Sequence, residues 1–252
     1  MGQNAMELRD VSFSYEAGEN VLDHISFSVS GNESIGLIGA NGVGKSTLLK
    51  LMVGLCPIAE GTICIDGLLV NKQNLSKIRE KTGYVFQDSD SQLFLTTVFE
   101  DVAFAPRNYG LGEEEVKKRV EAALEMVHIP HLRKKQIYKM SGGEKKLAAI
   151  AGVLSMRPSF MLLDEPTVAL DPGNRRNLIH LLNGFSFPKI IASHDLDMIW
   201  DTCERTILLY EGKIQKDGKT KEILRDQKLL LSCGLELPLR FSADGGALPP
   251  PA

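Results

Sequence analysis

Short apolar runs alternate with longer amphipathic segments along most of the chain. Residues 6–15 and 21–29 alternate apolar and polar positions, as half-buried strands do, and we expect them to form an antiparallel N-terminal sheet. Other short runs are mostly apolar without alternation, which is typical of strands buried on both faces of a parallel sheet; they cover residues 34–38, 160–163, 189–192 and 206–210. The pattern predicts an α/β fold with a largely parallel sheet.

A helical segment interrupts this pattern. After two further strand candidates, 62–66 and 83–86, residues 113–127 place apolar side chains at helical spacing and begin with three glutamates, which the dipole of a helix favours in its first turn. We therefore expect residues 88–155 to form a helical insertion. Within a single domain of residues 1–240, the sheet-forming core is then divided between residues 1–87 and 156–225. Residues 241–252 are rich in Gly, Pro and Ala and are expected to be a disordered tail.

Composition excludes several classes of protein. The 252 residues are 43% hydrophobic, which is enough for a well-buried core, and 29 Lys and Arg against 32 Asp and Glu leave a net charge of −3. This charge argues against a nucleic-acid partner. The four cysteines are scattered without a CxxC pair, as expected for reduced thiols in the cytoplasm. No apolar run approaches 18 residues and the N-terminus has no apolar signal core, so a role at a membrane would require a membrane partner.

The strongest chemical motif follows the strand predicted at residues 34–38. Residues 39–46, GANGVGKS, match GxxxxGK[ST] between a strand and a helical pattern, the context in which this motif forms a phosphate-binding loop. Glycines allow backbone amides to face phosphate oxygens, the lysine adds a positive charge and the serine can bind Mg²⁺. The sequence therefore predicts a nucleoside triphosphate site with Mg²⁺, and its candidate contacts are Gly39, Asn41, Gly42, Gly44, Lys45, Ser46 and Thr47.

A second motif supplies two carboxylates. The apolar run of residues 160–163 ends in Asp164 and Glu165. At the end of a strand, Asp164 can hold Mg²⁺ directly or through water, and Glu165 can polarise the water that attacks the γ-phosphate. Together with the phosphate-binding loop, this pair predicts hydrolysis of the nucleotide.

The third motif, Ser141-Gly142-Gly143-Glu144, permits two interpretations that can both hold. Ser-x-x-Glu before an apolar helix is a capping box, and a capped helix N-terminus with two glycines is also a phosphate site. In its position before the FMLLDE strand and ahead of KKLAAIAGVL, the segment resembles the signature sequence of ATP-binding-cassette (ABC) ATPases. The resemblance covers roughly residues 6–235 and implies a P-loop NTPase (RecA-like) core with an N-terminal antiparallel β-subdomain and an inserted α-helical subdomain.

The resemblance also implies roles for individual residues. Tyr15 would stack on adenine, Gln87 would sense Mg²⁺ and water and link to a membrane partner, Asp171 would lie at a dimer seam, and His194 would contact the γ-phosphate. Cassettes of this family form head-to-tail dimers, with each ATP held between the P-loop of one subunit and the signature of the other, and we expect a homodimer here. One departure is Glu144, where most cassettes carry glutamine; its carboxylate would repel phosphate unless it points at the ribose or caps its own helix.

Longer stretches narrow the resemblance to a subgroup. Residues 86–111, the signature segment and residues 194–214 look like the ATPases of energy-coupling-factor importers, most similar to the cobalt and nickel members. This implies a peripheral protein at the cytoplasmic face of the cell membrane, bound to a coupling protein and a substrate-binding component. The partner's coupling helices would contact Phe94, Leu95 and Phe99, unless these side chains only pack locally. A vitamin importer of the same type, and a soluble cassette of iron–sulfur cluster assembly, remain alternatives.

Overall fold

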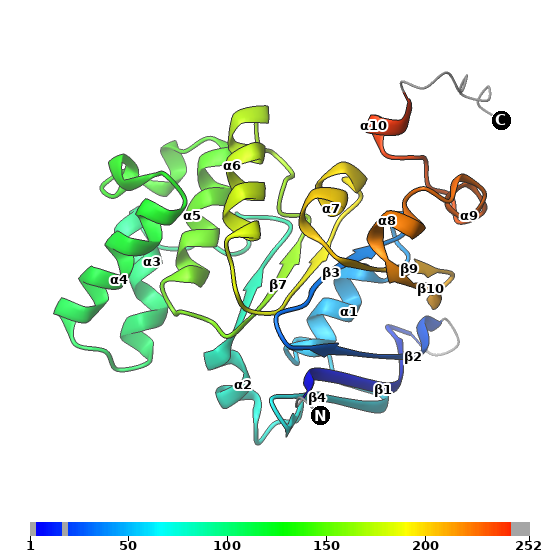
Figure 1. Ribbon diagram of the computed structural model, residues 1–252. Helices are drawn as coiled ribbons and strands as arrows, with labels where there is room; N and C mark the ends of the chain where they lie inside the picture. Colours follow the sequence, from blue (N-terminus) through cyan, green and yellow to red (C-terminus); the bar gives the residue numbers. More distant parts are fainter. Residues whose placement is uncertain (1–3, 17–19, 243–252) are drawn as a thin grey trace.

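The structure, a computed structural model, describes residues 4–16 and 20–242, whose strands form two sheets (Figure 1). Neighbouring strands of the larger sheet are parallel, except for a C-terminal hairpin. The strands lie in the order β10 (Lys213–Lys219), β9 (Arg205–Tyr210), β3 (Ser34–Ile38), β8 (Lys189–Ala192), β7 (Phe160–Asp164) and β6 (Thr82–Val85). The predicted α/β fold with a largely parallel sheet is confirmed, and so is the architecture that the resemblance implied, a P-loop core with an antiparallel β-subdomain and an inserted helical subdomain.

The larger sheet separates two apolar cores. Successive side chains of a strand point to opposite faces, so Phe160 and Leu162 of β7 join the core that contains α1 (Lys45–Met52) and the N-terminal sheet. Met161 and Leu163 join the second core, which lies against the helices of the other face. Burial on both faces is the physical reason why these strands appear as continuous apolar runs in the sequence.

The smaller sheet is antiparallel and consists of β2 (Asn20–Ser30), β1 (Asn4–Ser14), β4 (Glu60–Ile65) and β5 (Leu68–Leu69), in that order. Its inward side chains, such as Leu8 and Ile25, are buried with Leu48 of α1. Asp66 and Gly67 join β4 to β5 with φ of 48° and 76°, as a tight hairpin turn requires. The sheet therefore covers the helix that begins at the phosphate-binding loop.

A group of helices is inserted between β6 and β7, which are neighbours in the sheet although residues 86–159 separate them. Figure 1 shows this group in green beside the larger sheet. Buried apolar side chains, among them Val102, Val120 and Ile150, hold the helices together. The elements are α3 (Val98–Asn108), α4 (Glu113–Met126), the short 3-10 helices η1 (Pro130–Leu132) and η2 (Ile137–Lys139), and α5 (Gly142–Leu154); α2 (Leu75–Lys81) precedes β6.

The C-terminal part of the chain returns to the core. After β10 come α8 (Thr220–Ile223), α9 (Gln227–Ser232) and α10 (Leu239–Ser242), and α10 lies against α7 (Leu196–Thr202). The ring of Phe241 meets Trp200 of α7 edge to face, with 5.0 Å between ring centroids. The tail predicted from residue 241 onward thus begins within α10, and residues 243–252 lie outside the described residues.

Candidate functional site

A cavity of about 440 Å³ lies at the loop between β3 and α1. It is placed where the carboxyl ends of parallel strands meet the start of a helix, a common location of ligand sites in α/β proteins. All but one of its lining residues were predicted from the sequence, the exception being Val21. The lining consists of Tyr15, Val21, Asn41, Gly42, Gly44, Lys45, Ser46, Thr47, Gln87, Glu165 and His194.

The backbone of the loop needs glycine at both ends. Gly39 and Gly44 have φ of +152° and +106°. A Cβ atom at Gly39 would lie 2.5 Å from the carbonyl oxygen of Leu209, and one at Gly44 would lie 2.8 Å from Cδ2 of Leu22. Because Gly44 is the N-cap of α1 and offers no capping side chain, the first amides of the helix are left to bind an anion.

Lys45 is held close to this loop. The residue is 7% exposed, and its Nζ donates hydrogen bonds to the carbonyl oxygens of Gly39 at 2.7 Å and Ala40 at 3.1 Å. Burial lowers the pKa of Lys45, while the nearby carboxylates of Glu165 and Asp164 act to raise it. A buried ammonium with carbonyl partners is well placed to bind a polyphosphate.

Asp164 and Ser46 form a group of oxygen ligands. Ser46 Oγ donates to Oδ1 of Asp164 at 2.9 Å, and the hydroxyl of Tyr84 lies 3.4 Å from Oδ2. Burial and the neighbouring Glu165 raise the pKa of Asp164, against the hydrogen bonds from Ser46 and Tyr84. A hydroxyl and a carboxylate in contact, with the amide of Gln87 in the same cavity, are the hard oxygen donors that Mg²⁺ prefers, so the residues fit this ion.

Glu165 is fixed by the residues that follow β8. Its Oε2 accepts a hydrogen bond from Ser193 Oγ at 2.9 Å and lies 2.9 Å from His194 Nδ1, and its Oε1 accepts from the His194 amide at 3.1 Å. Glu165 has a φ of +46°, a conformation that costs a non-glycine residue about 1–3 kcal/mol and persists where the surroundings enforce it. Glu165 is buried, with 5% of the residue exposed, whereas 59% of the His194 side chain is exposed to solvent.

Tyr15 and Gln87 lie at the edge of the cavity. Tyr15 is 61% exposed, and its hydroxyl is 3.0 Å from Thr47 Oγ1, so the ring is anchored while remaining accessible to a planar ligand. Gln87 is exposed in the segment after β6, and its carbonyl oxygen accepts a hydrogen bond of 2.6 Å from Lys146. Both positions agree with the roles that the resemblance implied, which remain predictions.

The signature segment lies outside this cavity. Ser141 and Glu144 form the predicted capping box at the start of α5, and Gly143 lies beside Ala169 in the loop after β7. Asp171, at the end of that loop, caps α6 (Pro172–Asn183) by accepting hydrogen bonds from the amides of residues 173 and 174. Within one chain the structure therefore forms two separate groups of predicted residues, one around the P-loop and one around the signature.

The carboxylate of Glu144 is neutralised within its own chain. Lys135 Nζ donates to both of its oxygens at 2.8 Å, and the amide of Ser141 donates to Oε2 at 2.8 Å. These hydrogen bonds, that of Lys135 first, lower the pKa of Glu144. The expected repulsion of phosphate is therefore countered by a cation that the sequence analysis did not identify.

Several other supporting residues escaped the sequence analysis. Ser193 could have been found as the neighbour of His194, and Lys146 as a charged residue within the apolar run of α5.

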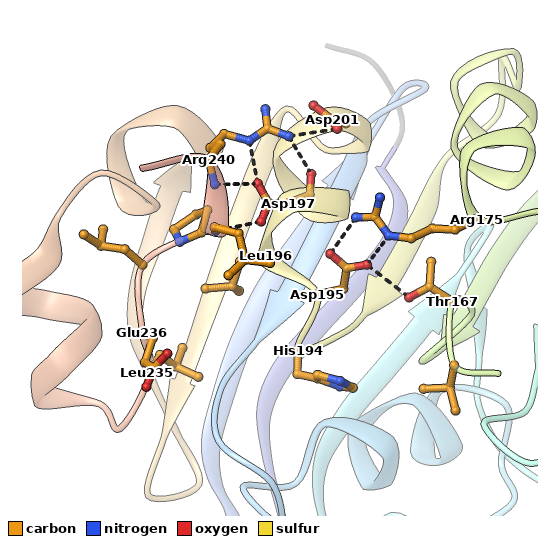
Figure 2. A pocket seen from close by; sticks show the side chains of 14 residues that line it. Thr167, Arg175, His194, Asp195, Leu196, Asp197, Asp201, Leu235, Glu236 and Arg240 are labelled. Atoms are coloured by element: carbon orange, nitrogen blue, oxygen red, sulfur yellow. Dashed lines mark hydrogen bonds and ion pairs between the residues drawn. The ribbon is translucent and has the colours of Figure 1, made fainter. Parts of the chain in front are cut away.

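On the far side of His194, Asp195 caps α7 and accepts a forked pair of hydrogen bonds from Arg175, at 2.7 and 2.8 Å (Figure 2). A second cavity of about 740 Å³ begins there, and the segment 235–240 closes its other side.

Histidines and cysteines elsewhere in the described residues form neither a metal site nor a disulfide. His128 and His131 lie at a turn and in η1, and the residues described, 4–16 and 20–242, contain no group of three His, Cys, Asp or Glu side chains arranged to hold a metal ion. Cys203 and Cys233 are buried, and Cys56 and Cys64 are partly buried, all as free thiols. None of the helices in these ranges has the length and apolar character needed to cross a bilayer.

Comparison with known proteins agrees with the geometry. Residues 22–168 match the model of the ABC transporter family. The chain is 44% identical to the energy-coupling factor transporter ATP-binding protein of Methanothermobacter thermautotrophicus, over 92% of this chain and 76% of that protein. The fold is similar to that of CbiO1 from Clostridium perfringens, part of the ABC transporter complex CbiONQ, with a TM-score of 0.80 and 34% identity over 91% of this chain and 94% of that one. It also resembles the dimeric cassette MJ0796 bound to ADP and phosphate, with a TM-score of 0.79 and 27% identity over 85% and 98% of the two chains.

Proposed function

The chain belongs to the ABC transporter family, as an ATP-hydrolysing subunit of the energy-coupling-factor type, and from this premise we propose that it powers the uptake of a transition metal ion, cobalt or nickel. The observation that carries the proposal is the similarity to CbiO1, which covers nearly the whole of both chains. The resemblance of residues 86–111 and 194–214 to cobalt and nickel importer ATPases supports the same cargo.

ATP binding rests on the P-loop. The amides of the first turn of α1 and the Nζ of Lys45 would bind the phosphates, and the exposed ring of Tyr15 would stack on adenine. Ser46, Asp164 and Gln87 would hold Mg²⁺ through oxygen atoms. When bound, this ion would neutralise charge on the phosphates.

Hydrolysis rests on Glu165 and His194. In our proposal the Glu165 carboxylate accepts a hydrogen bond from the attacking water and orients it, because Ser193 and His194 fix the position of its oxygens. The exposed imidazole of His194 would donate a hydrogen bond to the γ-phosphate, where negative charge develops during the reaction. Oriented groups of this kind act mainly by positioning and electrostatic stabilisation.

A second copy of the chain would complete each site. The signature, Ser141 to Glu144, and Asp171 lie apart from the P-loop cavity of their own chain, and a head-to-tail homodimer would bring them to the nucleotide of the partner. The cassette MJ0796 forms a dimer with ADP and phosphate, which supports this arrangement. Closure on ATP and reopening after hydrolysis would provide the motion that drives transport.

The motion would reach integral membrane subunits through the helical insertion. Phe94 is 62% exposed and its ring meets that of Phe104 at 4.8 Å, whereas Leu95 and Phe99 are partly buried. We propose that this surface receives a coupling helix, which would place the chain at the cytoplasmic face of the membrane as a peripheral subunit. Selection of the cargo would then belong to the membrane partners, and the net charge of −3 supports no nucleic-acid partner.

The test is recovery of the native complex from detergent-solubilised membranes, with metal analysis of the complex and ATPase assays with and without the partners. We expect integral partners that stimulate hydrolysis and carry Co²⁺ or Ni²⁺. Vitamin-binding partners would keep the mechanism and change the cargo. Exclusively soluble partners would contradict the transporter and favour a cassette of cluster assembly.

A further inference from the structure

Lys146 is a buried cation that the proposed mechanism does not use. It lies in the first turns of α5, two residues after the signature, and is 1% exposed. Its Nζ donates hydrogen bonds to the carbonyl oxygens of Phe86 at 3.0 Å and Gln87 at 2.6 Å. No carboxylate among the described residues forms an ion pair with it. Lysine is almost never fully buried without a charged partner, because desolvation of the ammonium is costly.

The two acceptors are consecutive peptide groups at the exit of β6. An ammonium that binds both carbonyls restrains the orientation of both peptide planes, and therefore of the backbone from which the Gln87 side chain enters the nucleotide cavity. Burial lowers the pKa of Lys146, and the carboxylates of Asp164, Asp88 and Glu165 act to raise it. A neutral side chain of the same length would supply neither the two hydrogen bonds nor this field.

Other contacts join the same two parts of the chain. The side-chain amide of Gln92 accepts from the Phe86 amide and donates to the carbonyl of Ala149 in α5, each at 3.0 Å. Lys145 forms an ion pair with Asp90. The segment 86–92 is thus attached to α5, the helix whose N-terminus carries the signature, and a displacement of α5 would displace the backbone at Gln87.

We infer that Lys146 is a positioning residue, which fixes the backbone of Gln87 and links it mechanically to the signature helix of the same chain. The inference rests on the proposed function, since that assigns Mg²⁺ binding and partner contact to Gln87. A displacement of α5 would be transmitted through Lys146 to Gln87, the proposed Mg²⁺ ligand in the nucleotide cavity of the same chain.

The experiment compares Lys146→Met, Lys146→Gln, Gln87→Ala and the double variant Lys146→Met/Gln87→Ala with the unchanged full-length chain. Lys146→Met keeps approximately the length and volume of the buried side chain, and Lys146→Gln keeps a neutral NH₂ donor group. Lys145→Met is the matched control, because it removes a lysine that joins the same segments without touching the Gln87 carbonyl. The readouts are hydrogen–deuterium exchange of residues 86–92 without nucleotide, and the Mg²⁺ concentration that half-saturates binding of a fluorescent, slowly hydrolysed ATP analogue.

We expect Lys146→Met to accelerate exchange in residues 86–92 and to raise the half-saturating Mg²⁺ concentration about tenfold, the lower end of the usual effect of residues that orient metal ligands. Gln87→Ala should have an effect at least as large, and the double variant should be no worse than Gln87→Ala, because both changes remove one function. Lys146→Gln should recover part of the lost Mg²⁺ affinity. Lys145→Met should leave the Mg²⁺ dependence unchanged and accelerate exchange less than Lys146→Met does, because its ion pair with the exposed Asp90 contributes little. If Lys146→Met does not fold, Lys146→Gln is read instead, with smaller changes in the same direction.

Additive effects of Lys146→Met and Gln87→Ala would overturn the inference, and so would exchange and Mg²⁺ dependence that stay unchanged in the Lys146 variants. Failure of the proposed function looks different. If Gln87→Ala itself leaves the Mg²⁺ dependence unchanged, the proposed role of Gln87 is wrong. The exchange of residues 86–92 then decides alone whether Lys146 restrains this backbone.

Discussion

Lys45 is the residue whose contacts with phosphate should contribute most to ATP affinity. Its ammonium already lies on the loop carbonyls at 2.7 and 3.1 Å, so it is ordered before the ligand arrives. A hydrogen bond to a charged group contributes about 1.5–3 kcal/mol. We expect Lys45→Ala to weaken ATP binding by about 10–100-fold in equilibrium titrations, while the exposed control Lys72→Ala leaves it unchanged. An unchanged affinity of Lys45→Ala for ATP would contradict the assignment of residues 39–46 as the phosphate-binding loop.

Glu165 is expected to act in ATP hydrolysis and to contribute little to ATP binding. The hydrogen bonds and the ion pair of its carboxylate are to Ser193 and His194, so Glu165→Gln should retain ATP binding. Loss of one positioned catalytic group lowers turnover by a factor on the order of 10²–10³, and we expect this loss in a steady-state phosphate-release assay. Unchanged turnover would assign the main catalytic role to His194.

The ion pair of Lys135 and Glu144 explains how a carboxylate is tolerated in the signature. Both side chains are about one-third exposed, so the pair contributes at most about 1 kcal/mol. Glu144→Gln retains an oxygen for the capping box and should leave ATPase activity the same or higher. Lys135→Met leaves the carboxylate without its cation and should raise the KM for ATP about twofold to fivefold.

The double variant Lys135→Met/Glu144→Gln tests this explanation, because it removes both charges. We expect its KM for ATP to return to that of the unchanged chain. A complete loss of activity in Glu144→Gln alone would instead show that the carboxylate has a specific function of its own.

At the scale of elements, the C-terminal segment is attached to the helix that follows His194. Arg240 forms ion pairs with Asp197 at 2.7 Å and Asp201 at 2.9 Å on α7 (Figure 2). Its guanidinium also lies 5.3 Å from the ring centroid of Trp200. Partly exposed ion pairs of this kind contribute about 1 kcal/mol together. Arg240→Ala should therefore release the segment without unfolding the chain.

The expected signals of this release are faster hydrogen exchange in residues 235–242 and a changed emission of Trp200, the single tryptophan of the chain. Arg176→Ala removes an exposed arginine from α6 and serves as the control. Equal exchange in both variants would mean that the apolar contact of Phe241 with Trp200 is sufficient to hold the segment.

Elements were predictable from the sequence where the signal is local. The P-loop, the strand that ends at Asp164 and the capping box at Ser141 each lie within a few consecutive residues, and the apolar runs revealed the strands of the larger sheet. The contact of Lys146 with Gln87 and that of Arg240 with α7 join residues about 40–60 positions apart, and no local periodicity encodes them. Lys146 is also buried although lysine is usually exposed, so its position depends on tertiary contacts that the local sequence does not reveal.

At the scale of the whole molecule, the separation of the two groups of site residues is the feature with the largest consequence. The lining of the P-loop cavity contains none of residues 141–144. The chain nevertheless contains both the P-loop and the signature, and it also contains Glu165, the carboxylate that would orient the attacking water. A homodimer would therefore contain two complete sites, each with the P-loop of one chain and the signature of the other.

Complementation between two defective chains tests this arrangement. Lys45→Ala disables the P-loop, and Gly142→Asp disables the signature by placing a carboxylate where phosphate would bind. The new aspartate occupies the first turn of α5, where the helix dipole favours it, so α5 should still fold. At an ATP concentration near the KM of the unchanged chain, each variant alone should have little activity. A mixture should regain part of the ATPase activity, because every mixed dimer contains one site with an intact P-loop and an intact signature. A mixture as inactive as its components would mean that each chain binds and hydrolyses ATP with its own residues alone.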